Sequence, residues 1–380
     1  MPETAPTPFE PELPGEVAAR RSGLRTGWTT GTCATAAAKA AALGLVSGQV
    51  PDEIEIGLPN GDRARFSVEH DVAVPAGGPA VAVVVKDAGD DPDCTNGARM
   101  TATVHFRNES AADHELIAGD GVGTVTKPGL GLPVGAPAIN PVPRSMILAA
   151  LDEVPGLGGS GGRFLRVEFS VPGGVEMAAE TTNDRLGILG GISILGTSGI
   201  VRPFSTAAYR ASVLQQVNVA AAQGERQMVF CTGARTERVA TTLFALDPVC
   251  FVEVGDFTGI ALRRCVATSM EAAAVVAMAG KITKLAAGIM MTHWHRSAVD
   301  TELLELVAVE TAAPPSVTAA ATETATARHF FEVCVAANFL APLERLCQMA
   351  AATCRTHTSG KLAIEVLMAD FEGERIVARG

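Results

Sequence analysis

The chain has 380 residues, with 41 acidic against 30 basic side chains, a formal net charge of −11 and 47% apolar residues. This acidic balance, with one tyrosine and two tryptophans, argues against a nucleic-acid partner, because phosphate binding needs basic surface and base stacking needs aromatic rings. Since no stretch reaches the roughly 18 uncharged apolar residues of a membrane span, no membrane association is expected. The eight cysteines form no CxxC pair, which indicates a reducing cytoplasm, no disulfides and no structural metal.

The first part of the chain predicts an α+β domain. Residues 1–20 are expected to form a disordered tail, because their prolines and acids cannot build a core. The segment GWTTGTCATAAAKAAALG (27–44) predicts a loop and an alanine-rich helix that ends at Gly44, and EIEIGLPNGDRARFSVEH (53–70) predicts a hairpin that turns at Asn60 and Gly61. Strands are expected over 80–86, 101–106 and 164–171, and long ordered loops, which are usually functional, over 87–99, 119–144 and 183–203.

From Gln227 the chain alternates between strands and helices, which is typical of a parallel sheet covered by helices. The strands QMVFC (227–231), CFVEV (250–254) and AAAVVAMAG (272–280) are each followed by a helical stretch. We therefore expect a Rossmann-like, three-layer α/β domain with a mostly parallel sheet, then helices over 298–355 and a late strand over 361–370. Ligands of such sheets bind at the carboxyl ends of the strands. The cofactor-binding candidates in those loops are Gly233, Gly255, Asp256, Gly259 and Gly280.

These patterns predict four segments. They are a tail over 1–20, an α+β domain over 21–224, a Rossmann-like domain with a helical extension over 225–357, and a returning strand over 358–380.

Two motifs of the first domain suggest chemistry. The helix start TTGTC (29–33) can bind an anion through its amides, or serve only as a helix cap. The loop KDAGDDPDCTNG (86–97) carries four aspartates, whose mutual repulsion is expected to raise their pKa values. Asp90 and Asp91 are therefore candidates for a general base, although bunched carboxylates can also bind a hard cation or form a solvated turn.

In the second domain, Lys281 and Lys284 lie three residues apart at a helix start. The helix dipole disfavours lysines there, which suggests an anionic partner, although surface lysines are the alternative. His293 and His295 form an HxH pair, but no further metal-ligand motif accompanies them, so ordinary hydrogen bonding remains open and no metal is expected.

In their order, several segments resemble the cobalt-precorrin-5B C(1)-methyltransferase (CbiD) family, from Arg25 to about Asp370. They are LRTGWTTGTCATAAAKAA, VVKDAGDDPDCTNGARM, GVGTVTKPGLGLPVGAPAINPVPR, FSVPGG, TNDRLGILGGISILGTSGIVRP and GKITKLAAGIMMTH. The resemblance implies an S-adenosylmethionine-dependent enzyme of the anaerobic-type cobalamin route that converts cobalt-precorrin-5B into cobalt-precorrin-6A, with cobalt only as part of the substrate. It also implies an α+β domain joined to a Rossmann-like domain. The chain departs from the family pattern at CTGARTE (231–237) and Trp294.

The implied substrate carries many carboxylates, which amide-rich loops and basic residues would bind. The substrate-binding candidates are Thr29, Thr30, Gly31, Thr32, Lys39, Lys127, Arg144, Lys281 and Lys284, and the candidates for handling a proton are Asp90, Asp91 and His293. A homo-oligomer is compatible with the sequence. Two alternatives stay open: a corrinoid carrier or assembly protein without turnover, and a small-molecule kinase, which the missing nucleotide fingerprint disfavours.

Overall fold

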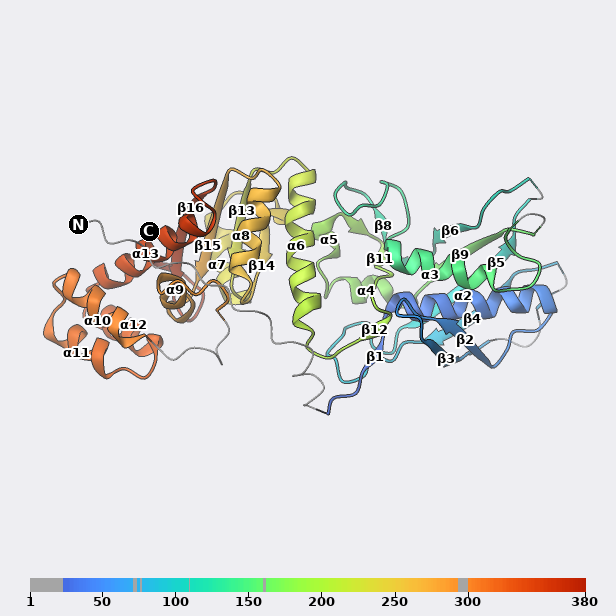
Figure 1. The fold of residues 1–380 in the computed structure, drawn as a ribbon, viewed down its shortest axis with the longest axis horizontal. Helices are drawn as coiled ribbons and strands as arrows, with labels where there is room; N and C mark the ends of the chain where they lie inside the picture. Colours follow the sequence, from blue (N-terminus) through green and yellow to red (C-terminus); the bar gives the residue numbers. More distant parts are fainter. Residues whose placement is uncertain (1–22, 71–73, 76, 109, 160–161, 293–299) are drawn as a thin grey trace. The chain divides into compact units, whose positions relative to one another are not determined.

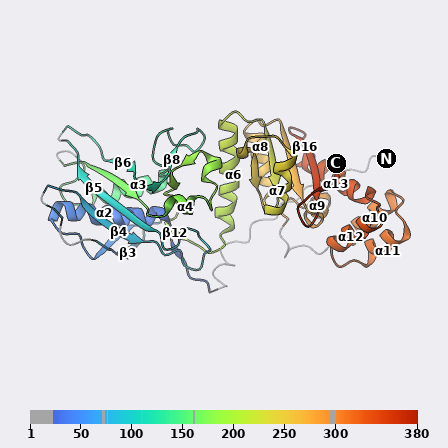
Figure 2. The same ribbon diagram turned by 180° about the vertical axis from the view of Figure 1, so that it is seen from behind.

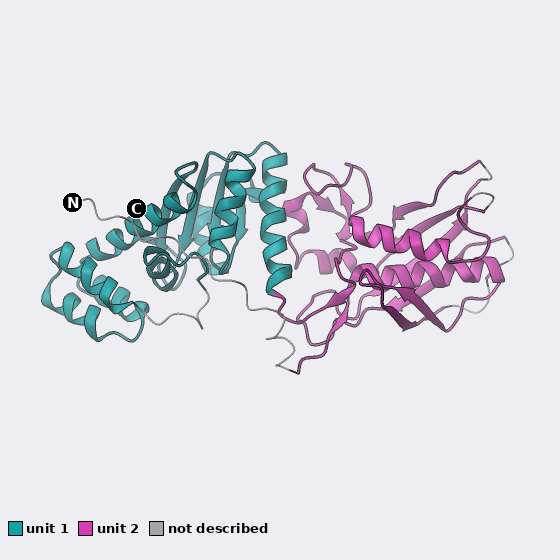
Figure 3. Cartoon of the chain, in the orientation of Figure 1, with its two compact units in different colours: residues 1–13, 206–380 teal, residues 14–205 magenta. Residues whose placement is uncertain are grey.

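The computed structural model describes residues 23–70, 74–75, 77–108, 110–159, 162–292 and 300–380. The expected tail over 1–20 and His293 lie outside the described residues. The chain has a mixed α/β fold with two compact units, an N-terminal unit whose described part ends at residue 205 and a C-terminal unit that runs from residue 206 to residue 380 (Figure 3). No helix in the described part of the chain is long and apolar enough to cross a membrane.

The N-terminal unit contains a four-stranded sheet in the order β4-β5-β9-β6, whose strands are β4 Ala80–Val85, β5 Arg99–Phe106, β9 Leu165–Ser170 and β6 Glu115–Ala118. Strand β5 runs antiparallel to both β4 and β9, and β6 runs parallel to β9. A separate hairpin joins β2 (Glu53–Gly57) to β3 (Arg63–Ser67). The predicted hairpin is confirmed, and Gly61 adopts the positive φ of 88° that such a turn favours.

Helix α2 (Thr30–Ser47) is the centre of this unit's core. Alanine has the highest helix propensity and the smallest side chain that still removes apolar surface from water, so sheet, hairpin and helix α3 (Pro141–Asp152) all pack closely against α2. Helices α2 and α3 lie side by side in both views (Figures 1 and 2). The predicted end at Gly44 is wrong: α2 continues to Ser47, and Gly48 caps it with a φ of 85°. Gly44 instead lies against Val50, where a Cβ would come within 2.4 Å of the valine side chain.

The long loops of the N-terminal unit are held by short strand pairs near the start of α2. These pairs are β1 (Gly27–Trp28) with β12 (Ile200–Val201), β7 (Gly121–Val122) with β11 (Gly191–Ile192), and β8 (Thr124–Val125) with β10 (Ile188–Leu189). Two short helices, α4 (Gly174–Ala178) and α5 (Asn183–Leu186), lie in the same region. Backbone hydrogen bonds therefore fix loops that are far apart in sequence against one another.

The C-terminal unit begins with helix α6 (Thr206–Ala222), which the sequence did not predict, and contains a five-stranded sheet in the order β14-β13-β15-β16-β17. The strands are β13 Gln227–Cys231, β14 Phe251–Glu253, β15 Ala272–Ala277, β16 Ala363–Ala369 and β17 Ile376–Arg379. All neighbours are parallel except β16 and β17. The predicted strand and helix alternation is confirmed here by α7 (Ala234–Leu243), α8 (Thr258–Ala267) and α9 (Ala279–Ala286).

Four helices fill the expected helical region before β16: α10 Thr301–Glu310, α11 Pro315–Glu323, α12 Ala327–Ala336 and α13 Ala341–His357. Helix α13 packs on β16, β17 and α9, whereas α12 contacts α9 (Figure 1). Helix α12 therefore lies close to the helix that follows the end of β15.

Candidate functional site

The carboxyl edge of the C-terminal sheet is the first candidate site. Strand β13 has β14 on one side and β15 on the other, so the chain reverses its direction of travel across the sheet between β13 and β15. Ligands of open parallel sheets bind at such a switch point. Gly233 follows β13, Gly255 and Asp256 follow β14, and Gly280 follows β15. The predicted glycine loops therefore meet at one edge.

Lys281 joins these three loops. Its ammonium group donates to the carbonyl oxygens of Thr232 at 3.1 Å and Gly255 at 2.9 Å, and lies 3.4 Å from a carboxylate oxygen of Asp256. The carbonyls belong to the ends of two strands, whereas Lys281 starts the helix after a third. These contacts occupy the donors of the ammonium group, so its predicted contact with a substrate carboxylate stays a prediction.

Replacing Lys281 with methionine should lower the free energy of unfolding by roughly 1.5–3 kcal/mol, the range for a hydrogen bond to a charged group. Methionine keeps the length of the side chain but leaves the carbonyls of Thr232 and Gly255 without this donor. Urea unfolding of the full chain measures the change. Lys361→Met, at an exposed lysine, is the matched control and should cost little. Equal stabilities of the two variants would show that Lys281 does not hold the strand ends together.

The glycines at this edge differ in whether the backbone conformation or the surrounding atoms exclude a larger residue. Gly255 has a φ of 53°, and a Cβ there would meet the ring of Tyr209 at 3.1 Å. Gly233 and Gly280 have neither constraint, because their φ values are ordinary and a Cβ would meet nothing within 4 Å. A glycine inside a helix costs about 1 kcal/mol relative to alanine, so the fold gives no reason for glycine at position 280. These two positions leave space for close approach of a ligand.

Further polar groups surround Asp256. Thr292 donates its hydroxyl to Asp256 at 3.2 Å, and Lys284 donates to the Thr292 carbonyl oxygen at 3.2 Å. Burial lowers the pKa of Lys284. Gly259, another cofactor candidate, lies buried in the first turn of α8, where its carbonyl oxygen is 3.1 Å from a ring nitrogen of His357.

Tyr209 is a residue that the sequence analysis missed at this edge. It is the single tyrosine of the chain, its hydroxyl donates to the Glu253 carbonyl oxygen at 2.9 Å, and its ring packs on Phe257. Burial raises its pKa above the ordinary tyrosine value. Its rarity in the sequence was the one signal that could have drawn attention to it.

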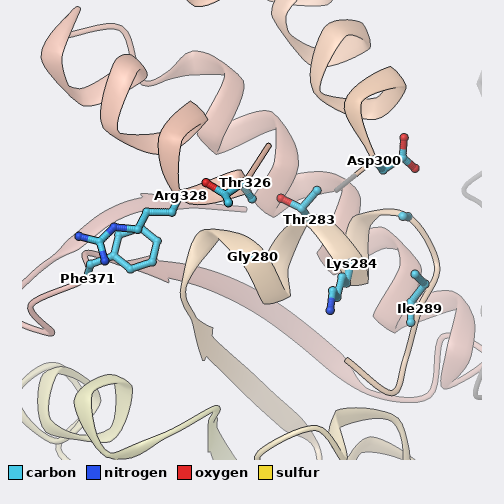
Figure 4. A pocket seen from close by; sticks show the side chains of 10 residues that line it. Gly280, Thr283, Lys284, Ile289, Asp300, Thr326, Arg328 and Phe371 are labelled. Carbon is cyan, nitrogen blue, oxygen red and sulfur yellow. The ribbon is translucent and has the colours of Figure 1, made fainter. Parts of the chain in front are cut away.

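A pocket of about 510 Å³ opens beside these strand ends (Figure 4). One face of α9 lines it with Gly280, Thr283, Lys284 and Ala287, and Ile289 follows that helix. The opposite walls come from Asp300 at the start of α10, from residues 326–328 at the start of α12, and from Phe371 after β16. The sequence analysis had singled out Gly280 and Lys284 but not the residues of the other walls.

The N-terminal unit holds the second group of candidates, at the start of α2. Thr30 donates to the carbonyl oxygens of Ser193 and Leu195, Thr32 donates to that of Gly199 at 2.7 Å, and the Gly31 amide donates to that of Leu195 at 3.0 Å. The Thr29 side chain caps the helix by accepting from the Thr32 amide. These contacts fasten the loop over 193–199 to the helix start, so both helix capping and anion binding remain open for residues 29–32.

The aspartate loop follows β4, and each of its four carboxylates has a partner. Asp87 forms a two-pronged ion pair with Arg25, and the buried Lys86 ammonium lies 2.6 Å from Asp93. Asp90 accepts from the Arg25 amide at 2.6 Å, and Asp91 accepts from the amide of Phe204 at 2.9 Å.

The electrostatics of this loop differ from the expectation. The hydrogen bond from Arg25 lowers the pKa of Asp87. Burial raises the pKa of Asp93, but hydrogen bonds from Lys86 and Thr95 outweigh it, so its pKa lies below the ordinary value. The prediction that mutual repulsion raises these carboxylate pKa values is therefore wrong for Asp87 and Asp93, because cations and N–H groups separate the charges.

The remaining basic candidates of this unit lie in different surroundings. Lys39 is buried, donates to the Glu55 carbonyl oxygen at 2.8 Å and forms an ion pair with Glu153, which Arg63 also contacts at 2.9 Å. Lys127 is half-buried and its side chain lies next to Gly187, whereas Arg144 is exposed in the first turn of α3. Lys39 is thus part of an ion-pair network within the unit, and its role in substrate binding stays a prediction.

The loops around the start of α2 also expose large apolar side chains, which the sequence analysis missed. They are Val134, Leu189, Leu195 and Phe204, with 48–69% of each residue exposed. Ladder and bridge contacts join three of their segments, since Leu189 pairs with Thr124, Thr124 bridges to Pro137 in the Val134 segment, and Ile139 of that segment bridges to Ile194 beside Leu195. Exposed apolar groups among basic residues are typical of a surface that binds an amphipathic ligand.

Within the described residues, no cluster of three or more His, Cys, Asp or Glu side chains is arranged to hold a metal ion. All eight cysteines fall in the described part, none of them forms a disulfide, and all but Cys94 are buried.

Comparison with known proteins identifies the family. The model described as CbiD matches residues 17–203, and that described as CbiD, C-terminal domain, matches residues 291–380. A cobalt-precorrin-5B C(1)-methyltransferase from Salinispora arenicola is 55% identical over 97% of this chain and 96% of its own, and one from Rubrobacter xylanophilus is 51% identical over 96% and 93%. A crystal structure of a cobalamin biosynthesis protein (cbiD) from Archaeoglobus fulgidus is 25% identical, covers 76% of this chain and 90% of its own, and has a TM-score of 0.38. The chain belongs to the CbiD family.

Proposed function

We propose that this chain is a cobalt-precorrin-5B C(1)-methyltransferase that uses S-adenosylmethionine in cobalamin biosynthesis. The observation that carries the proposal is its identity of 55% over almost the full length of a relative with that name. The product of the reaction is then cobalt-precorrin-6A. Cobalt is a constituent of the substrate.

The residues at the carboxyl edge of the C-terminal sheet fit an S-adenosylmethionine site of Rossmann-like type. When bound, S-adenosylmethionine supplies an electrophilic methyl group on a sulfonium. Gly233 and Gly280 leave open space at two neighbouring strand ends, as close approach of a ligand requires. Asp256 lies 3.4 Å from the Lys281 ammonium and accepts from Thr292, so we assign it the role of holding the strand ends beside the bound donor. Gly255 and Gly259 shape the loop and helix start beside it.

We assign the corrinoid to the loops of the N-terminal unit. The substrate combines an apolar macrocycle with peripheral carboxylates. Its faces would contact exposed apolar groups such as Leu189 and Leu195, and its carboxylates would accept hydrogen bonds from residues 29–32 and from basic side chains. The proposed cationic partners in this unit are Lys39, Lys127 and Arg144. The chain's contribution is to align the reacting groups and exclude water.

We assign proton handling to Asp90 or Asp91, with His293 as a further candidate. Both aspartates use one carboxylate oxygen to accept a backbone N–H. The second oxygen of each makes no hydrogen bond within the described part of the chain, which leaves it available to a substrate proton.

We propose cytoplasmic action, supported by eight cysteines that form no disulfide, as a reducing compartment favours. The division into an α+β domain ending at 224 and a Rossmann-like domain beginning at 225 is also a proposal. The compact units divide between residues 205 and 206, because α6 packs on α8 and β14. A homo-oligomer stays a prediction.

The decisive experiment incubates the full chain with cobalt-precorrin-5B and methyl-labelled S-adenosylmethionine, followed by mass analysis. We expect one labelled methyl group on ring carbon 1 and an equal amount of S-adenosylhomocysteine. Corrinoid binding without methyl transfer would instead indicate a carrier or assembly protein.

A further inference from the structure

The pocket of the C-terminal unit has two chemically different ends (Figure 4). At one end, the Arg328 guanidinium lies 4.7 Å from the centroid of the Phe371 ring. At the other end lie Lys284 and Asp300, a cation and an anion. Gly280 lies between the two ends, with no side chain to divide the space.

The aromatic end is held in place by several contacts. The ring of Phe331 meets Phe371 edge to face, with centroids 5.2 Å apart, and Arg235 donates to the Phe371 carbonyl oxygen at 2.6 Å. An ion pair with Glu332 at 2.7 Å positions Arg328. A ring and a guanidinium fixed in this way form a platform on which a flat heteroaromatic group can stack.

The volume limits the size of the ligand. About 510 Å³ lies within the roughly 300–1,000 Å³ of pockets that hold drug-sized molecules. A corrinoid with its carboxylate arms is considerably larger than such a molecule, so the pocket suits the methyl donor better than the methyl acceptor.

We propose that this pocket holds S-adenosylmethionine lengthwise, with adenine on Phe371 and Arg328, ribose and sulfonium past Gly280, and the zwitterionic amino acid between Lys284 and Asp300. The pocket has an aromatic end, a neutral middle and an end with one cation and one anion. This order matches the adenine, the ribose and the zwitterionic amino acid along the ligand. The assignment rests on the proposed function and refines it, because it locates the methyl donor beside β15 and β16.

Gly280→Val tests the middle of the pocket. A Cβ at this position meets no neighbour, so the two added methyl groups enter the pocket without straining the fold. Isothermal titration of the full chain should show S-adenosylmethionine affinity reduced at least tenfold, with the unfolding temperature retained. Ala267→Val, at an exposed position of α8, is the matched control and should bind as the wild type does.

Two further variants test the ends, with 5′-methylthioadenosine as a probe that lacks the amino acid. Phe371→Leu should weaken S-adenosylmethionine and the probe equally, on the order of tenfold, because stacking on a base is lost, and Phe371→Trp should restore both affinities. Lys284→Met should weaken S-adenosylmethionine but not the probe.

The outcomes separate the two proposals. Wild-type affinity for S-adenosylmethionine in both Gly280→Val and Phe371→Leu would overturn the pocket assignment and leave the proposed function intact. A wild-type chain that binds no S-adenosylmethionine would overturn the proposed function itself.

Discussion

Replacing Lys86 with methionine should lower the free energy of unfolding by about 3–5 kcal/mol at neutral pH, the range for removing one partner of a buried ion pair. The Lys86 side chain is 1% exposed and that of Asp93 is 23% exposed, so water replaces little of the lost interaction. Urea unfolding of the full chain measures the effect. Arg99→Met, which breaks an exposed ion pair with Glu69 in the same unit, should cost about 0–1 kcal/mol.

The same pair predicts a pH dependence. Because the folded pKa of Asp93 is lowered, its contribution to stability is present above the unfolded value, about 3.9, and is lost as the pH falls through the folded value. Lys86→Met removes one cause of the lowered pKa, so the stability difference between wild type and variant should narrow below pH ~4. A difference that stays constant down to acid denaturation would contradict the assigned pair.

Asn substitution at Asp90 and at Asp91 should separate a proton-handling group from a structural carboxylate. One of the two variants should lose roughly 10²-fold or more in turnover number, the typical contribution of a general base, while its affinities for both ligands stay near wild type. Asparagine keeps an oxygen that can accept from the amides of Arg25 or Phe204, so the loop retains its shape.

The control for this pair is Asp62→Asn, in the turn of the β2–β3 hairpin, where the side chain accepts from Asn60 at 2.6 Å. It should keep full turnover. Steady-state kinetics across the pH range provides the measurement. If Asp90→Asn and Asp91→Asn both retain wild-type turnover at every pH, the loop is structural and neither carboxylate handles a proton.

Local patterns predicted much of the fold. The hairpin was predictable because Asn60 and Gly61 specify a tight turn, and the strand and helix alternation of the C-terminal sheet was predictable because each strand is a short apolar run. Helix α6 was missed because its sequence carries no single apolar face. The end of α2 was misplaced because Gly44 is needed for close packing against Val50 and not for a cap.

The site was less predictable because its contacts join distant parts of the chain. The glycine loops gather because parallel strands end at one edge, which is a rule that the sequence alone can supply. Nothing local indicates that Arg25 pairs with Asp87, 62 residues away, or that Lys281 donates to Thr232. The pocket wall at Phe371 is equally remote from Gly280 in sequence.

The burial of α2 on every side limits how this protein can diverge. Most helices of globular domains have one buried face and one exposed face, and substitutions are tolerated mainly on the exposed face. Variable positions therefore recur with a period of 3.6 residues. In α2 the alanines from Ala34 to Ala42 are all completely buried, whichever way they point. A larger side chain at any of them would overpack the core. Related chains are therefore expected to vary little along this helix, without the usual periodicity.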